Sequence, residues 1–212
     1  MKKSNQIIPF YGGKQPDLFE IERRCMDREG KAINYLKESL PIGNILDVGT
    51  GNGFTAEKLR QQDRSLVAME PDENMADQNK NLIWADGIAQ NIPFHTNTFS
   101  AVYSTWAFFF DGITDINDGL REVERVCKPG GKIIIIDNYG NDEFCSLSPE
   151  NITSNVGDWV KWEFDYHIIE TAFIFDTVEE ARKLLTFYFR ENGNNVDKTE
   201  IEYKIVAYTK GV

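Results

Sequence analysis

Residues 44–53 read Asn-Ile-Leu-Asp-Val-Gly-Thr-Gly-Asn-Gly, a short apolar run followed at once by three alternating glycines. Glycines let the backbone turn sharply, and they let a ligand approach without meeting a Cβ atom. The pattern of residues 54–61 is that of a helix, whose first turn offers free N–H groups and the positive end of its dipole. The stretch therefore predicts a strand, a tight loop and a helix that together hold a ligand carboxylate or phosphate.

Strand-like and helix-like patterns alternate on both sides of this unit, which is typical of an α/β fold with a mainly parallel sheet. Four successive isoleucines at 133–136 suit a central strand that is covered on both faces. Thr177 and Glu180 form a capping-box pattern at the start of a late helix. Besides residues 44–48, strands are expected at 65–69, 82–85, 99–104, 132–137, 166–175 and 200–209, and the longer helices at 17–40, 119–126 and 177–189.

The spacing of the glycines separates two classes of ligand. A dinucleotide site prefers the pattern G-x-G-x-x-G, but the third glycine position counted from Gly49 is Phe54. The observed pattern is G-x-G-x-G, with Asp47 two residues before the first glycine. Glu70 ends the next predicted strand about 20 residues later, where a carboxylate accepts hydrogen bonds from both hydroxyls of a ribose.

Two further motifs follow in order. Asp86 ends the third predicted strand and opens the element Asp-Gly-Ile-Ala-Gln-Asn-Ile-Pro-Phe at 86–94. Residues 122–131 read Glu-Val-Glu-Arg-Val-Cys-Lys-Pro-Gly-Gly, which ends a helix, makes a tight turn at 128–131 and starts a strand. These four motifs lie between residues 44 and 137, and their order and spacing make a chance match much less probable than for any single motif.

In these motifs the chain resembles the class I S-adenosylmethionine-dependent methyltransferases. The resemblance implies a Rossmann-like, seven-stranded, mainly parallel sheet with helices on both faces and an antiparallel last strand between the fifth and the sixth. It places the ribose on Glu70, the adenine near Asp86 and the methionine part near the glycine loop. The implied cofactor-binding residues are Asp47, Gly49, Thr50, Gly51, Gly53, Glu70, Pro71, Asp86, Gly87, Ile88, Tyr103 and Ser104.

The acceptor side is less defined in the sequence. Trp106 and Tyr139 follow predicted strands and so face the crevice at the strand ends, whereas Tyr11 is a candidate lid residue in the N-terminal arm. An ordinary surface or core role for Tyr11 is an equally good interpretation. His167 and Asp137 are among the possible general bases, and no catalytic base is assigned because methyl transfer relies largely on alignment.

Composition limits the remaining possibilities. A net charge of -11 repels phosphate backbones and anionic membranes, which favours a small-molecule acceptor over nucleic acid. We expect no membrane span and no secretory signal, and three cysteines with two histidines predict a cytoplasmic protein without a disulfide framework or a metal site. The expected organisation is one domain, 1–212, with an N-terminal arm and helix at 1–40 and a substrate-side insertion at 140–165.

The leading hypothesis is therefore methyl transfer from S-adenosylmethionine to a small molecule. A protein that binds this cofactor without transferring its methyl group, as a sensor or a subunit of a complex, needs the same glycine loop and stays an alternative. A nicotinamide-dependent oxidoreductase is a weaker alternative because of the glycine spacing. The sequence predicts neither the acceptor nor the oligomeric state.

Overall fold

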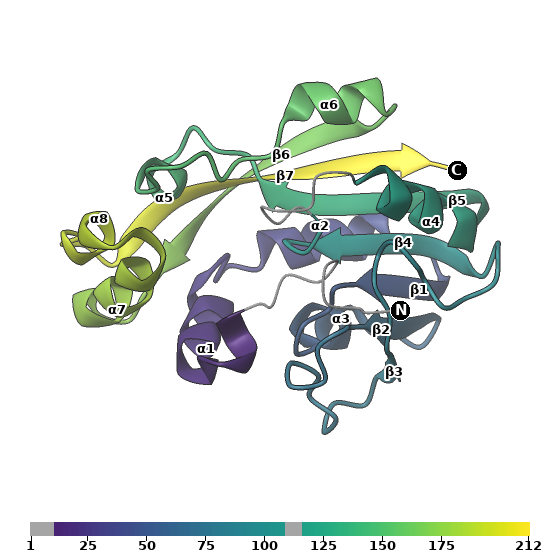
Figure 1. Cartoon of the computed structure of the whole chain (residues 1–212), viewed down its shortest axis with the longest axis horizontal. Coiled ribbons are helices and arrows are strands. Elements are labelled where there is room, and N and C mark those ends of the chain that lie inside the picture. The colour runs from purple at the N-terminus through teal and green to yellow at the C-terminus, as the bar shows by residue number, and fades with distance from the viewer. Residues whose placement is uncertain (1–10, 109–115) are drawn as a thin grey trace.

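The computed structural model describes residues 11–108 and 116–212. Within these residues, seven strands form one sheet in the order β3-β2-β1-β4-β5-β7-β6 (Figure 1). The strands β1 to β5 pair in parallel, whereas β7 lies between β5 and β6 and runs antiparallel to both. This topology confirms the predicted fold class. The strands are β1 (Gly43–Val48), β2 (Arg64–Met69), β3 (Ile83–Ala85), β4 (Phe99–Thr105), β5 (Cys127–Asn138), β6 (Asp165–Ile174) and β7 (Glu200–Gly211).

Helices cover both faces of the sheet, as predicted. The buried residues of α1, α2, α3 and α7 belong to one hydrophobic cluster, and those of α4 and α6 belong to a second cluster on the opposite face. The helices are α1 (Pro16–Cys25), α2 (Lys31–Ser39), α3 (Phe54–Leu59), α4 (Asn117–Val126), α5 (Glu143–Ser146), α6 (Val156–Lys161), α7 (Val178–Phe189) and α8 (Glu191–Asn194), with a short 3-10 helix η2 (Tyr11–Gly13) before them.

The isoleucine run in β5 shows why this strand is central. Ile134 and Ile136 contribute to the first cluster, whereas Ile133 and Ile135 contribute to the second. Successive side chains of a strand point to opposite faces, so an unbroken apolar run fits a strand that is covered on both sides. The turn predicted at 128–131 is instead part of β5, whose pairing with β4 shifts register between Phe99 and Ala101.

The single helix predicted at 17–40 is wrong, because the chain forms two helices there. Asp27 adopts a φ of 50° and Gly30 a φ of 72°, so the backbone leaves the helical region between α1 and α2. The Asp27 carboxylate accepts hydrogen bonds from the backbone N–H groups of Lys31 (3.0 Å) and Ala32 (2.8 Å) at the start of α2. The Asp27 N–H also donates to the Ala172 carbonyl of β6, so the break between α1 and α2 is fixed by a strand far away in the sequence. Helix propensity, which depends on local sequence, does not reveal this contact.

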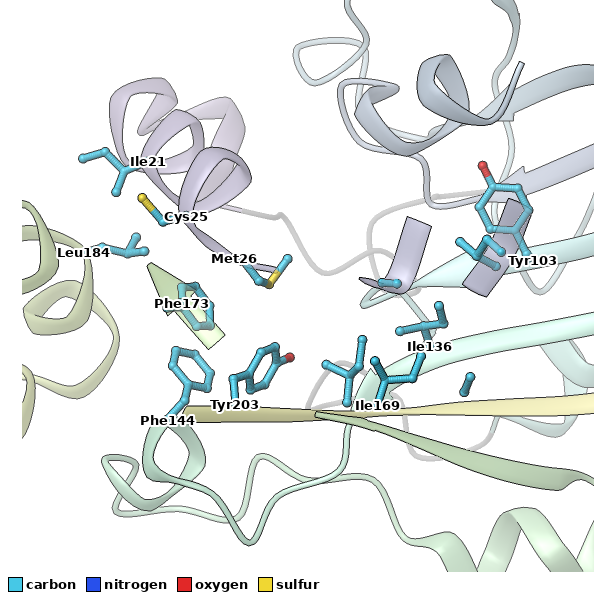
Figure 2. Close-up of a cluster of buried hydrophobic side chains, with 14 of the residues drawn as sticks. Ile21, Cys25, Met26, Tyr103, Ile136, Phe144, Ile169, Phe173, Leu184 and Tyr203 are labelled. Carbon is cyan, nitrogen blue, oxygen red and sulfur yellow. The ribbon is translucent and has the colours of Figure 1, made fainter. Parts of the chain in front are cut away.

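The polar segment at 140–155 is organised by buried side chains rather than by sequence periodicity. Phe144 of α5 stacks on Phe173 of β6, with ring centroids 4.4 Å apart, and Figure 2 shows both beside Tyr203 of β7.

The predicted cap of α7 is confirmed, because the Glu180 N–H donates to Thr177 Oγ1 at 3.1 Å. In the described ranges, no helix has the length and apolar character required to cross a bilayer.

Candidate cofactor and acceptor site

The glycine loop after β1 uses backbone conformations that favour glycine. Gly49 and Gly51 have φ values of 72° and 57°. A Cβ atom on Gly49 would lie 2.4 Å from the Cβ atom of Ala107, so no larger residue fits there without a shift. The N–H groups of Gly49 and Thr50 both donate to the Met69 carbonyl at the end of β2. The loop is therefore tied to β2 on one side and packed against the segment after β4 on the other.

Asp47 lies beneath this loop and is almost completely buried. Its Oδ2 atom accepts hydrogen bonds from Thr50 Oγ1 (2.7 Å) and from the Tyr103 hydroxyl (2.8 Å). Its Oδ1 atom is buried and has no hydrogen-bond partner within the described part of the chain. Burial raises the pKa of Asp47 to about 7, although the two hydroxyl donors act in the opposite direction. The unpartnered oxygen fits a ligand donor, because leaving such an atom unpaired is costly.

Glu70 follows β2 and connects the two loops. Its Oε2 atom accepts from the Gly51 N–H (2.8 Å), and its Oε1 atom accepts from the Asp72 N–H (3.1 Å). Each carboxylate oxygen has two lone pairs, so both oxygens keep capacity for a ligand diol. Burial raises the pKa of Glu70 above its ordinary value, and the two backbone donors partly offset this effect.

A cavity of about 730 Å³ opens beside these groups, along the carboxyl ends of the strands. It brings together eight of the predicted site residues, which come from loops after β1, β2, β3 and β4. These residues are Gly49, Thr50, Gly51, Glu70, Pro71, Gly87, Ile88 and Trp106. The predicted convergence of four separate segments thus occurs at one edge of the sheet.

Other predicted site residues lie outside the cavity lining. Tyr103 and Ser104 lie within β4, in the strand predicted at 99–104, where Ser104 Oγ donates to the Val48 carbonyl at 2.8 Å. Both are buried in the sheet, so their effect on a ligand passes through Asp47 and β1. Gly53 begins α3, and a Cβ atom there would meet Leu82 at 2.6 Å.

Four more predicted residues are also separate from the lining. Asp47 lies beneath the glycine loop and is 1% exposed. Asp86 is exposed, although the next two residues line the cavity. Tyr139 is half-buried and packs against the second hydrophobic cluster. Tyr11 begins η2, and its side chain lies outside the described residues. His167 is exposed on β6 and stacks on Tyr35 with ring centroids 5.4 Å apart, so it does not line the cavity.

Beyond Trp106 the cavity continues toward β5, β7 and the loop at 148–154. Trp106 has a φ of 50°, a conformation that costs energy for a large side chain and often marks a functional site. Its Nε1 donates to the Tyr203 hydroxyl at 2.8 Å, and that hydroxyl donates to Asn138 Oδ1. Asn138 Nδ2 in turn donates to the Ile152 carbonyl at 2.8 Å. This chain of hydrogen bonds joins the ends of β4, β5 and β7 to the 148–154 loop.

Asp137 lines the cavity next to this network and is 9% exposed. Its Oδ1 atom accepts a hydrogen bond from the Asn138 N–H at 2.8 Å. Burial raises the pKa of Asp137 to about 7, and the Asn138 N–H lowers it only in part. The sequence indicated both Asp137 and His167 as possible bases, and the structure distinguishes Asp137 from the exposed His167 by its burial in the cavity lining.

Sequence patterns did not indicate Arg23, which lies on α1 and lines the cavity. Its side chain is 13% exposed, and its Nε atom is buried without a partner among the residues described. The guanidinium lies over the rings of Phe19 and Trp106, with its Cζ atom 5.5 Å and 5.6 Å from their centroids. Arg23 Nη2 lies 3.8 Å from Glu22 Oε1, whereas the open Nε donor of this half-buried guanidinium is suited to a carboxylate ligand. In the sequence, Arg23 is one of many charges on an amphipathic helix, so only its position identifies it.

Comparisons with known proteins agree with this geometry. A family model described as "Methyltransferase domain" matches residues 46–135. Over 166 residues, the chain is 31% identical to the ubiquinone/menaquinone biosynthesis C-methyltransferase UbiE of Rickettsia bellii, covering 67% of this chain and 66% of that protein. The chain belongs to the class I S-adenosylmethionine-dependent methyltransferase family. This membership confirms the family and the cofactor, S-adenosylmethionine, that the motifs predicted.

Other matches define how far the likeness extends. A demethylmenaquinone methyltransferase of Corynebacterium urealyticum is 36% identical over 101 residues, which cover 46% of this chain and 42% of that protein. Two solved structures share the fold of this methyltransferase-family chain. The YcgJ protein of Bacillus subtilis has a TM-score of 0.60 at 18% identity, covering 84% of this chain and 96% of that one. A SAM-dependent methyltransferase of Aquifex aeolicus has a TM-score of 0.60 at 20% identity, covering 92% and 99%.

Proposed function

We propose that this protein transfers a methyl group from S-adenosylmethionine to a small-molecule acceptor. The observation that carries the proposal is a single cavity with two differently built ends. One end has the glycine loop and the Glu70 carboxylate, which suit a nucleoside joined to an amino acid. The other end continues past Trp106 into a second space, so an acceptor has room beside the cofactor.

Each end of the cofactor has a proposed partner. Glu70 accepts hydrogen bonds from the ribose hydroxyls, and Gly87 and Ile88 line the place for the adenine. Asp47 lies beneath the glycine loop, outside the cavity lining, and its Oδ1 atom is open to a hydrogen-bond donor. The Arg23 guanidinium pairs with the cofactor carboxylate. These assignments use two of the four buried side-chain atoms that lack a hydrogen-bond partner in the described residues, the Asp47 Oδ1 atom and the Arg23 Nε atom.

The bound sulfonium cofactor supplies an activated methyl group, so this chain's residues need to align the acceptor and exclude water. Trp106 is held for that task by its hydrogen bond to Tyr203.

The names of the Rickettsia and Corynebacterium relatives support a small-molecule acceptor. The net charge of -11 disfavours nucleic acid. The proposal treats residues 1–212 as one cytoplasmic methyltransferase domain in which 140–165 lies on the acceptor side.

The cofactor assignments are tested by calorimetry with two ligands. S-adenosylmethionine carries the amino acid end, whereas 5′-deoxy-5′-methylthioadenosine has the same nucleoside without it. We expect Glu70→Ala to weaken the binding of both ligands by about 1–3 kcal/mol, because both present the diol. Arg23→Leu should weaken binding of S-adenosylmethionine alone.

Two exposed residues outside the cavity lining provide matched controls, Glu73→Ala and Arg60→Leu, which should bind both ligands as the wild type does. Unchanged affinity in folded Glu70→Ala protein removes Glu70 from the site.

Methyl transfer itself is measured with labelled S-adenosylmethionine and a metabolite extract. Tight cofactor binding with no labelled product from any extract favours the alternative, a binding protein without transferase activity.

A further inference from the structure

Asp137 lines the cavity and directly precedes Asn138, a member of the hydrogen-bond network around Trp106. β4 and β5 are paired with Thr105 opposite Ile136, and the Trp106 N–H donates to the Ile136 carbonyl at 2.9 Å. Asp137 is the next residue of β5, so it lies beside Trp106 at the carboxyl edge of the sheet. The cavity runs along this edge of the sheet, and its lining includes Glu70 on the proposed cofactor side and Tyr203 on the proposed acceptor side.

The hydrogen bonding of Asp137 differs from that of two other buried aspartates. Asp142 caps α5 by accepting from the Cys145 N–H, and its second oxygen accepts from the Lys204 N–H. Asp27 accepts from two N–H groups and from the Thr171 hydroxyl. Both are therefore satisfied by the fold. Asp137 takes one backbone donor at Oδ1, and no described residue donates to Oδ2.

The described titratable groups whose pKa responds to the charge of Asp137 carry no positive charge that would neutralise it. They are the tyrosines Tyr203 and Tyr208 of β7 and the Cys145 thiol of α5, and burial raises the pKa of each of the three above its ordinary value. All three are neutral near pH 7. A buried carboxylate without a cationic partner is costly, which is why such groups gather at functional sites.

We propose that Asp137 is the group that accepts the acceptor's proton, and that the acceptor is a small molecule that presents a hydroxyl or an amine N–H to it. This inference rests on the proposed function. It goes further by assigning a base and by restricting the acceptor to protic compounds. The pKa of about 7 supports the assignment, because a base works best when its pKa lies near the working pH.

The reaction balances without a further reagent. The bond between sulfur and the methyl carbon breaks, and its electron pair stays on sulfur. A lone pair of the acceptor oxygen or nitrogen forms the new bond to the methyl carbon. The proton of that hydroxyl or N–H moves to Asp137 Oδ2 and later leaves to solvent. The products are the methylated acceptor and S-adenosylhomocysteine.

The test uses the full chain saturated with S-adenosylhomocysteine at pH 8, where Asp137 is ionised. Three probes of similar size that are uncharged at pH 8 are titrated by NMR: phenol, aniline and toluene. We expect phenol or aniline to bind at least tenfold more tightly than toluene and to shift the carboxyl carbon signal of Asp137. Preference for phenol identifies a hydroxyl acceptor, and preference for aniline identifies an amine.

Asp137→Asn keeps an oxygen that can accept the Asn138 N–H, and we expect the variant to reduce the preference for the protic probe to less than threefold. Asp197→Asn makes the same change at an exposed residue outside the cavity lining and should behave as the wild type does. Equal binding of all three probes, or an unchanged preference in folded Asp137→Asn protein, overturns the inference. Failure of the wild type to bind S-adenosylhomocysteine overturns the proposed function as well, so the two failures are distinguishable.

Discussion

The cofactor side and the acceptor side of the cavity are built in different ways. On the cofactor side, a backbone N–H of the glycine loop meets the Glu70 carboxylate across 19 residues of sequence. On the acceptor side, the Tyr203 hydroxyl joins Trp106 and Asn138, which lie 97 and 65 residues away. The first side uses backbone groups that follow consecutive strands. The second uses side chains from non-consecutive strands, so its chemistry changes with single substitutions while the cofactor loop stays intact.

The largest effect is expected from Gly49→Ala, which tests the backbone character of the cofactor side. The φ of 72° and the 2.4 Å approach to Ala107 each oppose a Cβ atom. We expect the free energy of unfolding to fall by about 3–5 kcal/mol and the affinity for S-adenosylmethionine to fall more than 100-fold. Urea denaturation and calorimetry measure the two quantities.

Gly130→Ala is the matched control for this substitution. Gly130 has a similar φ of 76°, and a Cβ atom there would meet nothing within 4 Å. The control should lose about 1 kcal/mol of stability from its backbone conformation alone. Equal losses in the two variants would show that the contact with Ala107 is unimportant and that the loop tolerates side chains.

Asp47→Asn gives the next largest effect, on the dependence of stability on pH. Burial raises the pKa of Asp47 in the folded protein to about 7, above its ordinary value of 3.8. The folded state therefore binds this proton more tightly than the unfolded state does. The stability that the proton contributes is fully present below about pH 4 and is lost as the pH rises to about 7.

The Asn variant lacks this loss, so its free energy of unfolding relative to the wild type should rise by about 4 kcal/mol between pH 4 and pH 8. Denaturation series at several pH values measure the difference, with Asp197→Asn as the exposed control. A difference that is flat over this range would contradict the raised pKa. It would also remove the contrast between Asp47 and the buried aspartates Asp27 and Asp142, whose carboxylates accept hydrogen bonds at both oxygens.

The smallest effect is expected from Tyr203→Phe, which sharpens the comparison from the acceptor side. The variant leaves Trp106 Nε1 and Asn138 Oδ1 without their hydroxyl partner. We expect a loss of about 1–2 kcal/mol in unfolding free energy. Affinity for S-adenosylmethionine should stay within twofold, because Glu70 and the glycine loop are untouched.

Tyr166→Phe on β6, where the residue is 50% exposed, serves as the control and should change stability by less than about 0.5 kcal/mol. If Tyr203→Phe weakened cofactor binding as strongly as Glu70→Ala does, the two sides would be energetically coupled. The division drawn between them would then be wrong.

Local patterns were sufficient for most of the framework. The apolar runs predicted all seven strands of the described sheet, and the glycine spacing distinguished the cofactor from a dinucleotide. They were insufficient at 17–40, where Asp27 turns the chain toward β6. They placed Tyr103 and Ser104 in a strand, as observed, but only the packing shows that both side chains are buried in the sheet.

By itself, the sequence determined the order of strands and helices, the glycine loop and the acids that end β1 and β2. Periodicity and motif spacing encode these features because each depends on residues that are neighbours along the chain. Tertiary structure alone decided that Arg23, Asp137 and Tyr203 line one cavity. Their nearness depends on the sheet order that places β7 beside β5 and on the packing of α1 over the first cluster. No local pattern records that order, because the hydrogen bonds and desolvation that distinguish these three side chains arise only after distant segments have packed together.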